Sequence, residues 1–392
     1  MSDENAALKI VPTFVVSELV SKVDDDDGPF FIANIGDVVD KVNKWRKLMP
    51  RIEPFYAIKC NDNLMLLTIL HSLGVGFSAV SKNEIEKVIK IGARANQIFY
   101  SNPCKPRFHL KFAASHKVQF MTFDNVSELY KIKKLCPEAK LLLRLMIDDS
   151  DTHYQLGSKY GVEIDDVSSV LQTAQQLQLN VVGISHKYLT SFNIASNAIN
   201  AVSVEKVMLS FIYHIGHGRT DTSFYISAIK IAKTAFNYGK SAGYNFNILN
   251  IGGGFPGYAD SIFEKICVDV NKALDEHFPL ASNVKIISSA GRYFAASAFH
   301  LTVSVVSKRE LKCSRTETSE VKSINTESKR FMYYINDALH VSFDMGAYAL
   351  TLHTSFNGLD KASVYHFIDR KTWDAMKDKL LPYFNNISEV DL

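Results

Sequence analysis

The feature that most constrains the fold of this chain is a series of eight apolar, β-rich stretches separated by segments of helical periodicity. The predicted strands cover residues 54–59, 76–80, 98–102, 118–123, 140–146, 181–185, 246–254 and 284–292. Most gaps between them carry apolar residues at helical spacing, as in residues 82–91 and 221–238. Repeated strand-helix units form parallel sheets, so eight repeats predict a (β/α)₈ TIM-type barrel.

The pattern changes after Tyr293 to alternating apolar residues without helical spacing. The segments that carry this alternation are FAASAFHLTVSVV, RFMYYIND, GAYALTLHTSF and SVYHFI. Strict alternation is typical of antiparallel sheets with one covered face, so a C-terminal antiparallel β domain is predicted. We therefore divide the chain into an N-terminal segment that feeds the β domain (1–50), the barrel (51–293) and the β domain (294–392).

Composition excludes several classes of protein. The 392 residues are 47% hydrophobic and 22% charged, which is typical of a soluble globular protein, and the net charge of +3 gives no basic footprint for nucleic acid or anionic membrane. Five cysteines without CxxC spacing argue against disulfides and a zinc site, so no metal is expected. The N-terminal segment lacks a basic region followed by an apolar run, which predicts a cytoplasmic protein.

Lys59 lies at the end of the first predicted barrel strand, in the segment PFYAIKCN. Lysine is almost never buried without a partner, so an apolar strand that ends in lysine can present a partly desolvated amine. Such an amine can form a Schiff base with an aldehyde. The alternative is a lysine whose charged end simply reaches solvent at the end of a strand.

Glycines follow the seventh predicted strand, and an arginine ends the eighth. Gly252, Gly253 and Gly254 would let backbone N–H groups approach an anion, and Arg292 follows Gly291. In a barrel, function lies at the carboxyl ends of the strands, and the last two loops commonly bind phosphate. An amine for an aldehyde and a cradle for a phosphate are the two anchors that pyridoxal phosphate requires. A glycine triplet alone would equally serve a tight turn.

Three further residues are candidates for the same site. His214, in HIGHG, could lie flat against the cofactor ring, or be a structural histidine. Arg144 closes the fifth strand before Asp148 and Asp149 and could pair with site residues, or serve a structural pair. Tyr348, in MGAY, could donate its hydroxyl to the phosphate, or be a core aromatic of the β domain.

The order of these motifs resembles eukaryotic ornithine decarboxylases, a family of fold-type III pyridoxal phosphate enzymes with a barrel and a C-terminal β domain. The matching segments are PFYAIKCND, FYSNPCKP, MTFDN, LLLRL with DDS, IGGGFPG, GRYFAASAF, MYYIND and MGAY with SFNG. The resemblance implies that Lys59 forms the Schiff base and that His214 stacks on the ring. It also implies that Gly252, Gly253, Gly254, Arg292 and Tyr348 contact phosphate, and that Lys159 lies at a dimer interface.

Several departures from the family pattern fall on the chemistry. Ser289 stands where the family has a glutamate that keeps the pyridine nitrogen protonated. Without an anionic partner, the ring draws electrons less strongly from the carbanion that remains after CO₂ leaves. Losing a charged hydrogen bond of about 1.5–3 kcal/mol would slow that step roughly tenfold to a hundredfold or more. Ser78 and His217 also replace an aspartate and a serine of the family.

Two larger departures concern whole segments. Phe343 is followed directly by Asp344, whereas the family has between these motifs a long stretch with a substrate-binding aspartate and a Cys-Asp pair. We therefore predict a truncated β domain with an internal deletion near 343–344. Residues 186–210 form an insertion by the same comparison, although insertions normally fall on loops. A retained intron and a skipped exon would explain both, and sequencing the transcript tests this.

Three functions are compatible with these residues. The first is pyridoxal phosphate-dependent decarboxylation of L-ornithine to putrescine in polyamine synthesis, impaired in this chain, as a homodimer or as a heterodimer with a complete paralogue. The second is an inactive, antizyme-binding regulator whose binding surface corresponds to residues 113–140, with Lys117, Lys131, Lys133, Lys134 and Lys140. A lysine-rich helix face is otherwise simply solvated. The third is another amino-acid reaction on the same scaffold.

Overall fold

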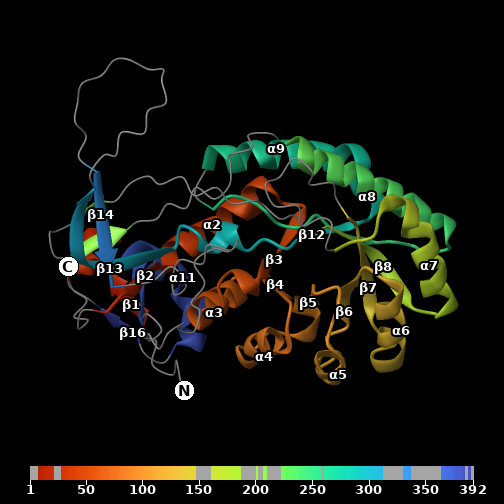
Figure 1. Ribbon diagram of the computed structural model, residues 1–392, viewed down its shortest axis with the longest axis horizontal. Coiled ribbons are helices and arrows are strands. Elements are labelled where there is room, and N and C mark those ends of the chain that lie inside the picture. Colours follow the sequence, from red (N-terminus) through yellow and green to blue (C-terminus); the bar gives the residue numbers. More distant parts are fainter. Residues whose placement is uncertain are drawn as a thin grey trace, which may run out of the picture.

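The computed structural model has a closed parallel barrel on one side and a second sheet on the other (Figure 1). It describes residues 8–21, 28–146, 160–186, 200–201, 206–209, 222–257, 260–311, 330–336, 363–384 and 387–389. Among these residues, no helix is long and apolar enough to cross a membrane.

The predicted barrel is confirmed, with all eight strands in the expected order. Its strands are β3 (Ile52–Ala57), β4 (Gly76–Ala79), β5 (Ile98–Tyr100), β6 (Phe120–Phe123), β7 (Lys140–Arg144), β8 (Asn180–Ser185), β11 (Ile248–Asn250) and β12 (Lys285–Ser288). Each pairs in parallel with its neighbours, and β12 closes the barrel on β3. Most strands end earlier than predicted, so Lys59 and Gly252 lie in the segments that follow them, and Arg292 begins a short helix. Apolar character continued past the last ladder hydrogen bond because those loops are themselves partly buried.

Helices surround the barrel and cover its apolar strands. They are α3 (Leu64–Ser72), α4 (Lys82–Lys90), α5 (Arg107–Ser115), α6 (Val126–Leu135), α7 (Val167–Gln176), α8 (Ser223–Ser241) and α9 (Asp260–His277). Three of them begin just after a strand at a polar residue whose side chain accepts a backbone N–H, namely Asn63, Ser81 and Asn125. The predicted helices at 82–91 and 221–238 correspond to α4 and α8.

The second sheet is mixed, whereas the sequence predicted an antiparallel one. Its order is β16 (Ile387–Glu389), β1 (Leu8–Val11), β15 (Ser363–Asp369), β2 (Phe30–Asn34), β13 (Phe299–Leu311), β10 (Lys206–Leu209) and β9 (Asn200–Ala201), and β14 (Arg330–Ile335) also pairs with β13. Strands β1, β2 and β15 are mutually parallel because a helix follows each of them. These helices are α1 (Val16–Val20), α2 (Ile35–Leu48) and α11 (Arg370–Leu380).

Helix α2 joins the two halves of the molecule, between the second sheet and the barrel (Figure 1). Its Trp45 is fully buried and donates a hydrogen bond from Nε1 to the Ile52 carbonyl at 2.9 Å. Aromatic rings from the last barrel segments surround it, with centroids 5.1 Å away for Phe255 and 5.3 Å for Tyr293. Lys41 of α2 donates to the Gly257 carbonyl, just after the glycine loop. The short helix α10 (Arg292–Ala295) also packs on α2.

Candidate functional site

The loops after β3 and β12 meet at the carboxyl end of the barrel. Lys59 is half-buried in a short 3₁₀ turn, Ile58–Cys60, directly after β3. Gly291 faces this turn so closely that an added Cβ would lie 2.8 Å from the Cβ of Cys60. Burial raises the pKa of the Cys60 thiol to about 11, while the charges of Arg292 and Lys59 oppose that rise. Because Arg292 follows Gly291, the segment that carries the predicted phosphate arginine lies against the turn that carries the predicted amine.

The glycines after β11 are required by the shape of their loop. Gly252 and Gly254 have φ values of 76° and 86°, in the left-handed region that glycine tolerates best. A Cβ on Gly253 would lie 2.5 Å from the Ser289 carbonyl oxygen. Gly252 donates to Asn250 Oδ1 at 2.9 Å, and its carbonyl accepts from Ser288 Oγ at 2.7 Å. The loop is thus held against the end of β12.

Tyr225, near the start of α8, lies behind this loop and was missed by the sequence analysis. Its hydroxyl donates to the Gly253 carbonyl at 3.4 Å, and its ring stacks on Phe255 at 5.2 Å between centroids. Burial raises the pKa of Tyr225, and the charge of Arg292 opposes this rise, which places Arg292 within electrostatic range. An isolated tyrosine in a helical pattern carries no sequence signal for such a role.

A neutral polar group replaces the expected carboxylate near the end of β12. Ser289 Oγ accepts from Asn250 Nδ2 at 3.0 Å, and the same amide donates to Ser185 Oγ at 3.3 Å. The side-chain amide of Asn250 thereby links the ends of three strands, β8, β11 and β12. Asn250 and Ser185 were not predicted, because their proximity depends on adjacent strands in the closed barrel.

His186 follows β8 directly and is almost completely buried, with 1% of its surface exposed. Its backbone N–H donates to the Asn250 carbonyl at 2.9 Å, but neither ring nitrogen has a hydrogen-bond partner in the part of the chain that the structure describes. Burial lowers the pKa of His186 to about 3, so the imidazole is neutral. The sequence analysis placed His186 only at the start of the insertion.

Arg144 lies on a neighbouring part of the same barrel end. Its guanidinium is buried, with Cζ 4.9 Å from the centroid of the Tyr160 ring. Burial lowers the pKa of Arg144, while the negative charge of Asp124 opposes that shift. Asp124 in turn accepts from the Gly161 N–H at 3.0 Å. These contacts fit both alternatives for Arg144, site residue and structural pair.

The remaining predicted site positions are either engaged elsewhere or not described. Ser78 donates to Ser101 Oγ at 2.8 Å inside the barrel. His214, His217, Tyr348 and Lys159 lie outside the described residues, as do Asp148, Asp149, Phe343 and Asp344.

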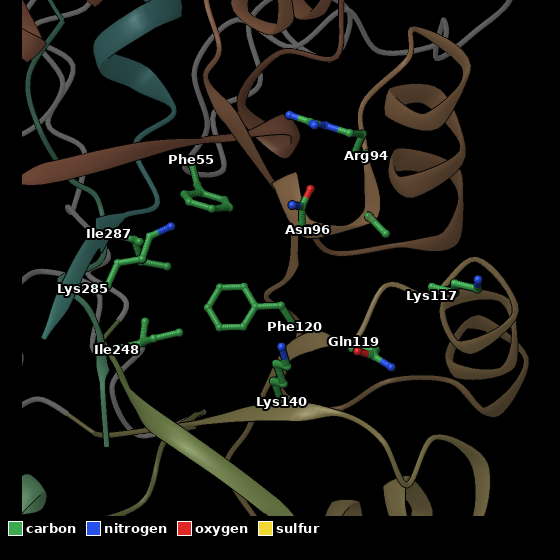
Figure 2. A pocket seen from close by; sticks show the side chains of 11 residues that line it. Phe55, Arg94, Asn96, Lys117, Gln119, Phe120, Lys140, Ile248, Lys285 and Ile287 are labelled. Carbon is green, nitrogen blue, oxygen red and sulfur yellow. The ribbon is translucent and has the colours of Figure 1, made fainter. Parts of the chain in front are cut away.

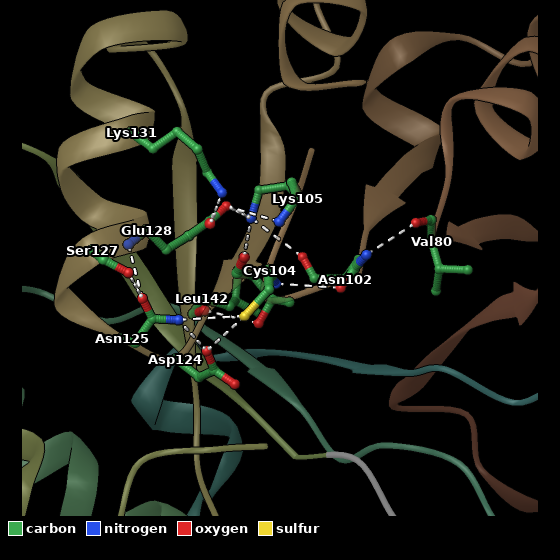
Figure 3. Close-up of polar contacts among 11 residues, drawn as sticks. Val80, Asn102, Cys104, Lys105, Asp124, Asn125, Ser127, Glu128, Lys131 and Leu142 are labelled. Carbon is green, nitrogen blue, oxygen red and sulfur yellow. Dashed lines mark hydrogen bonds and ion pairs between the residues drawn. The ribbon is translucent and has the colours of Figure 1, made fainter. Parts of the chain in front are cut away.

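Charged residues after β5 form a buried cluster that the sequence analysis also missed (Figure 3). Lys105 Nζ lies 2.8 Å from Glu128 Oε1, with side-chain exposures of 0% and 2%. The same ammonium donates to the Thr122 carbonyl at 2.7 Å, and Lys131 lies 2.5 Å from the other oxygen of Glu128. This cluster ties the loop after β5 to α6.

The chemistry of this barrel end suits pyridoxal phosphate at two of its groups. Lys59 offers an amine where an aldehyde could be bound. The glycine loop has two left-handed glycines and packs its backbone closely against Ser289, and such a glycine-rich loop can turn backbone N–H groups toward a phosphate. The hydrogen-bond partner of Ser289 Oγ is the uncharged amide of Asn250, so among the described residues no charged side chain acts there.

Comparisons with known proteins agree with this geometry. The family model described as "Pyridoxal-dependent decarboxylase, pyridoxal binding domain" matches residues 35–191 and 187–296. The two matched stretches meet where the sequence analysis predicted an insertion.

Among curated relatives, antizyme inhibitor 2 of Xenopus laevis is 39% identical over 83% of this chain, which spans 65% of that protein. Ornithine decarboxylase of Rattus norvegicus is 32% identical over 96% of this chain and 88% of its own length. That alignment covers 435 positions, but the chain has 392 residues, so at least 43 positions (435 less 392) have no counterpart here.

Solved structures give the same assignment. The arginine decarboxylase of Paramecium bursaria Chlorella virus has a TM-score of 0.68 and 29% identity, over 84% of this chain and 77% of its own. Ornithine decarboxylase of Entamoeba histolytica has a TM-score of 0.63 and 26% identity, over 82% and 80%. The chain therefore belongs to the family of fold-type III, pyridoxal phosphate-dependent decarboxylases that contains the eukaryotic ornithine decarboxylases.

Proposed function

We propose that this chain holds pyridoxal phosphate through Lys59, the glycine loop and Arg292, and acts on L-ornithine as an impaired decarboxylase. The observation that carries the proposal is the close approach of Gly291, the residue before Arg292, to the turn that carries Lys59, beside the glycine loop that packs against Ser289. In this family the cofactor supplies the electron sink for the electrons that remain when CO₂ leaves. The protein binds and orients it: Lys59 at the aldehyde, the loop and Arg292 at the phosphate.

Impairment is proposed from two features. Ser289 is a neutral hydroxyl that accepts from Asn250, so no carboxylate acts at that position. The resemblance to the family implies a missing stretch after Phe343, which would remove the substrate-binding aspartate and the Cys-Asp pair, and the longer alignment with the rat enzyme is consistent in length with such a loss. A complete paralogue in a heterodimer could supply those groups to the Lys59 site. A heterodimer no faster than the paralogue with its own site lysine disabled would exclude this arrangement.

The first test is the visible absorbance of the purified protein titrated with pyridoxal phosphate. We expect a band of the lysine-bound cofactor that Lys59→Ala abolishes, because Lys59 is the amine proposed to bind the aldehyde. Lys47→Ala on the exposed side of α2 serves as the control and should keep the band. Absence of the band in the unmodified protein would refute cofactor binding.

Release of labelled CO₂ from carboxyl-labelled L-ornithine tests the impairment. A Ser289→Glu variant restores an anion at the end of β12, so we expect about tenfold faster release or more. Equal rates in the two proteins would mean that the missing charge does not limit turnover.

The second candidate is a regulator that binds antizyme without turnover. The similarity to antizyme inhibitor 2 favours it, as do the exposed Lys117, Lys134 and Lys140 within residues 113–140. Lys131 is a weaker candidate, since it is already paired with Glu128. Immobilised antizyme should retain the purified protein but should not retain a Lys117→Glu/Lys134→Glu variant. Failure to retain the unmodified protein would exclude this function.

A further inference from the structure

A cavity lies at the opposite end of the barrel from Lys59 and the glycine loop. It encloses about 490 Å³ and is lined by the first residues of several strands, including Phe120 of β6, Lys140 of β7, Ile248 of β11 and Lys285 of β12. Binding sites for small molecules typically enclose roughly 300–1,000 Å³. The amino-terminal mouth of this barrel is thus large enough for a small ligand.

The floor of this cavity is apolar. Phe55 and Ile287 are buried members of a small cluster inside the barrel, against which Phe120 and Ile248 pack while remaining partly open to the cavity. The Phe120 ring lies 4.7 Å from Phe99 and 6.4 Å from Phe55, centroid to centroid. Figure 2 shows the Phe120 ring projecting into the open space. A flat apolar body could pack on this ring and displace water from it.

The rim of the cavity is cationic. Arg94, Lys140 and Lys285 come from three separate segments, and Lys117 stands at the outer edge with its ammonium directed away from the centre (Figure 2). Glu53 pairs with Lys285, but no carboxylate in the described part of the chain lies within 4.0 Å of Arg94, Lys117 or Lys140. The whole chain is nearly neutral, at +3, so the excess of positive charge is local.

We propose that this mouth binds a small organic anion, an aromatic carboxylate, with its ring on Phe120 and its carboxylate beside Lys140 and Arg94. An apolar floor beneath unpaired cations matches one flat apolar body with one negative charge. A neutral aromatic would leave the cations unused, and inorganic phosphate would leave the apolar floor in water. The site is separate from the Lys59 site and does not depend on the proposed function.

Isothermal titration with 2-naphthoate tests the proposal, with 2-naphthamide and inorganic phosphate as comparison probes. We expect 2-naphthoate to bind at least roughly tenfold more tightly than either, and added salt to weaken it, because the cations are exposed to solvent. Saturation with pyridoxal phosphate should leave the affinity unchanged. Equal binding of the acid and the amide, or competition by pyridoxal phosphate, would overturn the assignment.

Variants locate the bound anion. Lys140→Gln should weaken 2-naphthoate roughly fivefold to tenfold, whereas Lys134→Gln on exposed α6 makes the same change of charge outside the cavity and should not. Phe120→Leu should weaken the acid and the amide alike, since it removes the ring from the floor. Circular dichroism checks that each variant is folded. Unchanged affinity in Lys140→Gln would refute the site, because this exposed side chain can be replaced without disturbing the core.

Discussion

Gly253 lies where the loop after β11 packs against Ser289, the residue that follows β12. Its φ is not in the left-handed region, so contact rather than backbone angle excludes a side chain there. We expect Gly253→Ala to cost about 1–3 kcal/mol of unfolding free energy and to weaken pyridoxal phosphate, because the loop must move away from Ser289. Urea unfolding and cofactor titration measure the two effects.

Gly243→Ala is the matched control for that prediction. Gly243 has a φ of 79°, and its nearest atom to an added Cβ is the end of the Gln175 side chain at 3.4 Å. This variant carries the cost of a left-handed alanine but should leave the cofactor affinity unchanged. Equal loss of affinity in the two variants would show that the contact with Ser289 is unimportant.

His186 should make the stability of the protein fall in mild acid. Its pKa is about 3 in the folded protein and 6.5 as the ordinary value, so the unfolded chain binds a proton first as the pH falls. The stabilising contribution is complete above pH 6.5 and is lost below it, at about 1.4 kcal/mol per pH unit.

A His186→Leu variant, similar in volume, removes that proton-binding group. We expect its unfolding free energy to fall less than that of the unmodified protein between pH 7 and pH 5, as followed by urea unfolding at each pH. Parallel pH profiles would contradict the burial of a neutral imidazole at this position.

At the scale of elements, the Lys105 and Glu128 pair connects the loop after β5 to α6 (Figure 3). Removing one member of a buried ion pair leaves the other charge without compensation, which typically costs about 3–5 kcal/mol. Glu128→Gln should therefore lower the unfolding free energy by several kcal/mol in urea, somewhat less if Lys105 loses its proton. Burial already lowers the pKa of Lys105, which makes such a loss easier.

Two further variants test whether the unpaired charge of Lys105 explains that loss of stability. Glu138→Gln changes an exposed carboxylate just after α6 and should have little effect. Lys105→Met/Glu128→Met replaces both charges by apolar groups and should recover much of the lost stability. If the double variant is as unstable as Glu128→Gln, packing rather than the unpaired charge explains the loss.

At the scale of the whole molecule, one continuous core joins the barrel and the second sheet. Trp45 of α2 and Trp373 of α11 belong to the same cluster of buried side chains, and they are the only tryptophans of the chain. A shared core favours unfolding of both halves together. In Trp45→Phe and Trp373→Phe, we expect the fluorescence of the remaining tryptophan to change at the same urea concentration as the far-UV circular dichroism. Separate transitions in either variant would show that the sheet and the barrel unfold independently.

The sequence predicted the barrel well but the second sheet only in part. Barrel strands are short apolar runs whose helices follow at once, so the pattern is local, and all eight strands were found. The second sheet takes β1 and β2 from the start of the chain and β15 and β16 from its end, and their parallel pairing is not visible in alternation alone. Strand ends were also misplaced, because apolar character does not stop where ladder hydrogen bonds stop.

By itself, the sequence determined the fold class, the family and the chemistry available at the carboxyl ends of the strands, through Lys59, the glycines and Arg292. These features depend on residue type and on spacing along the chain. Only the tertiary structure decided that Asn250 joins Ser185 and Ser289, and that a cationic rim surrounds an apolar cavity at the other mouth. The reason is physical: closing the barrel brings together side chains far apart in sequence, and no local pattern records those contacts.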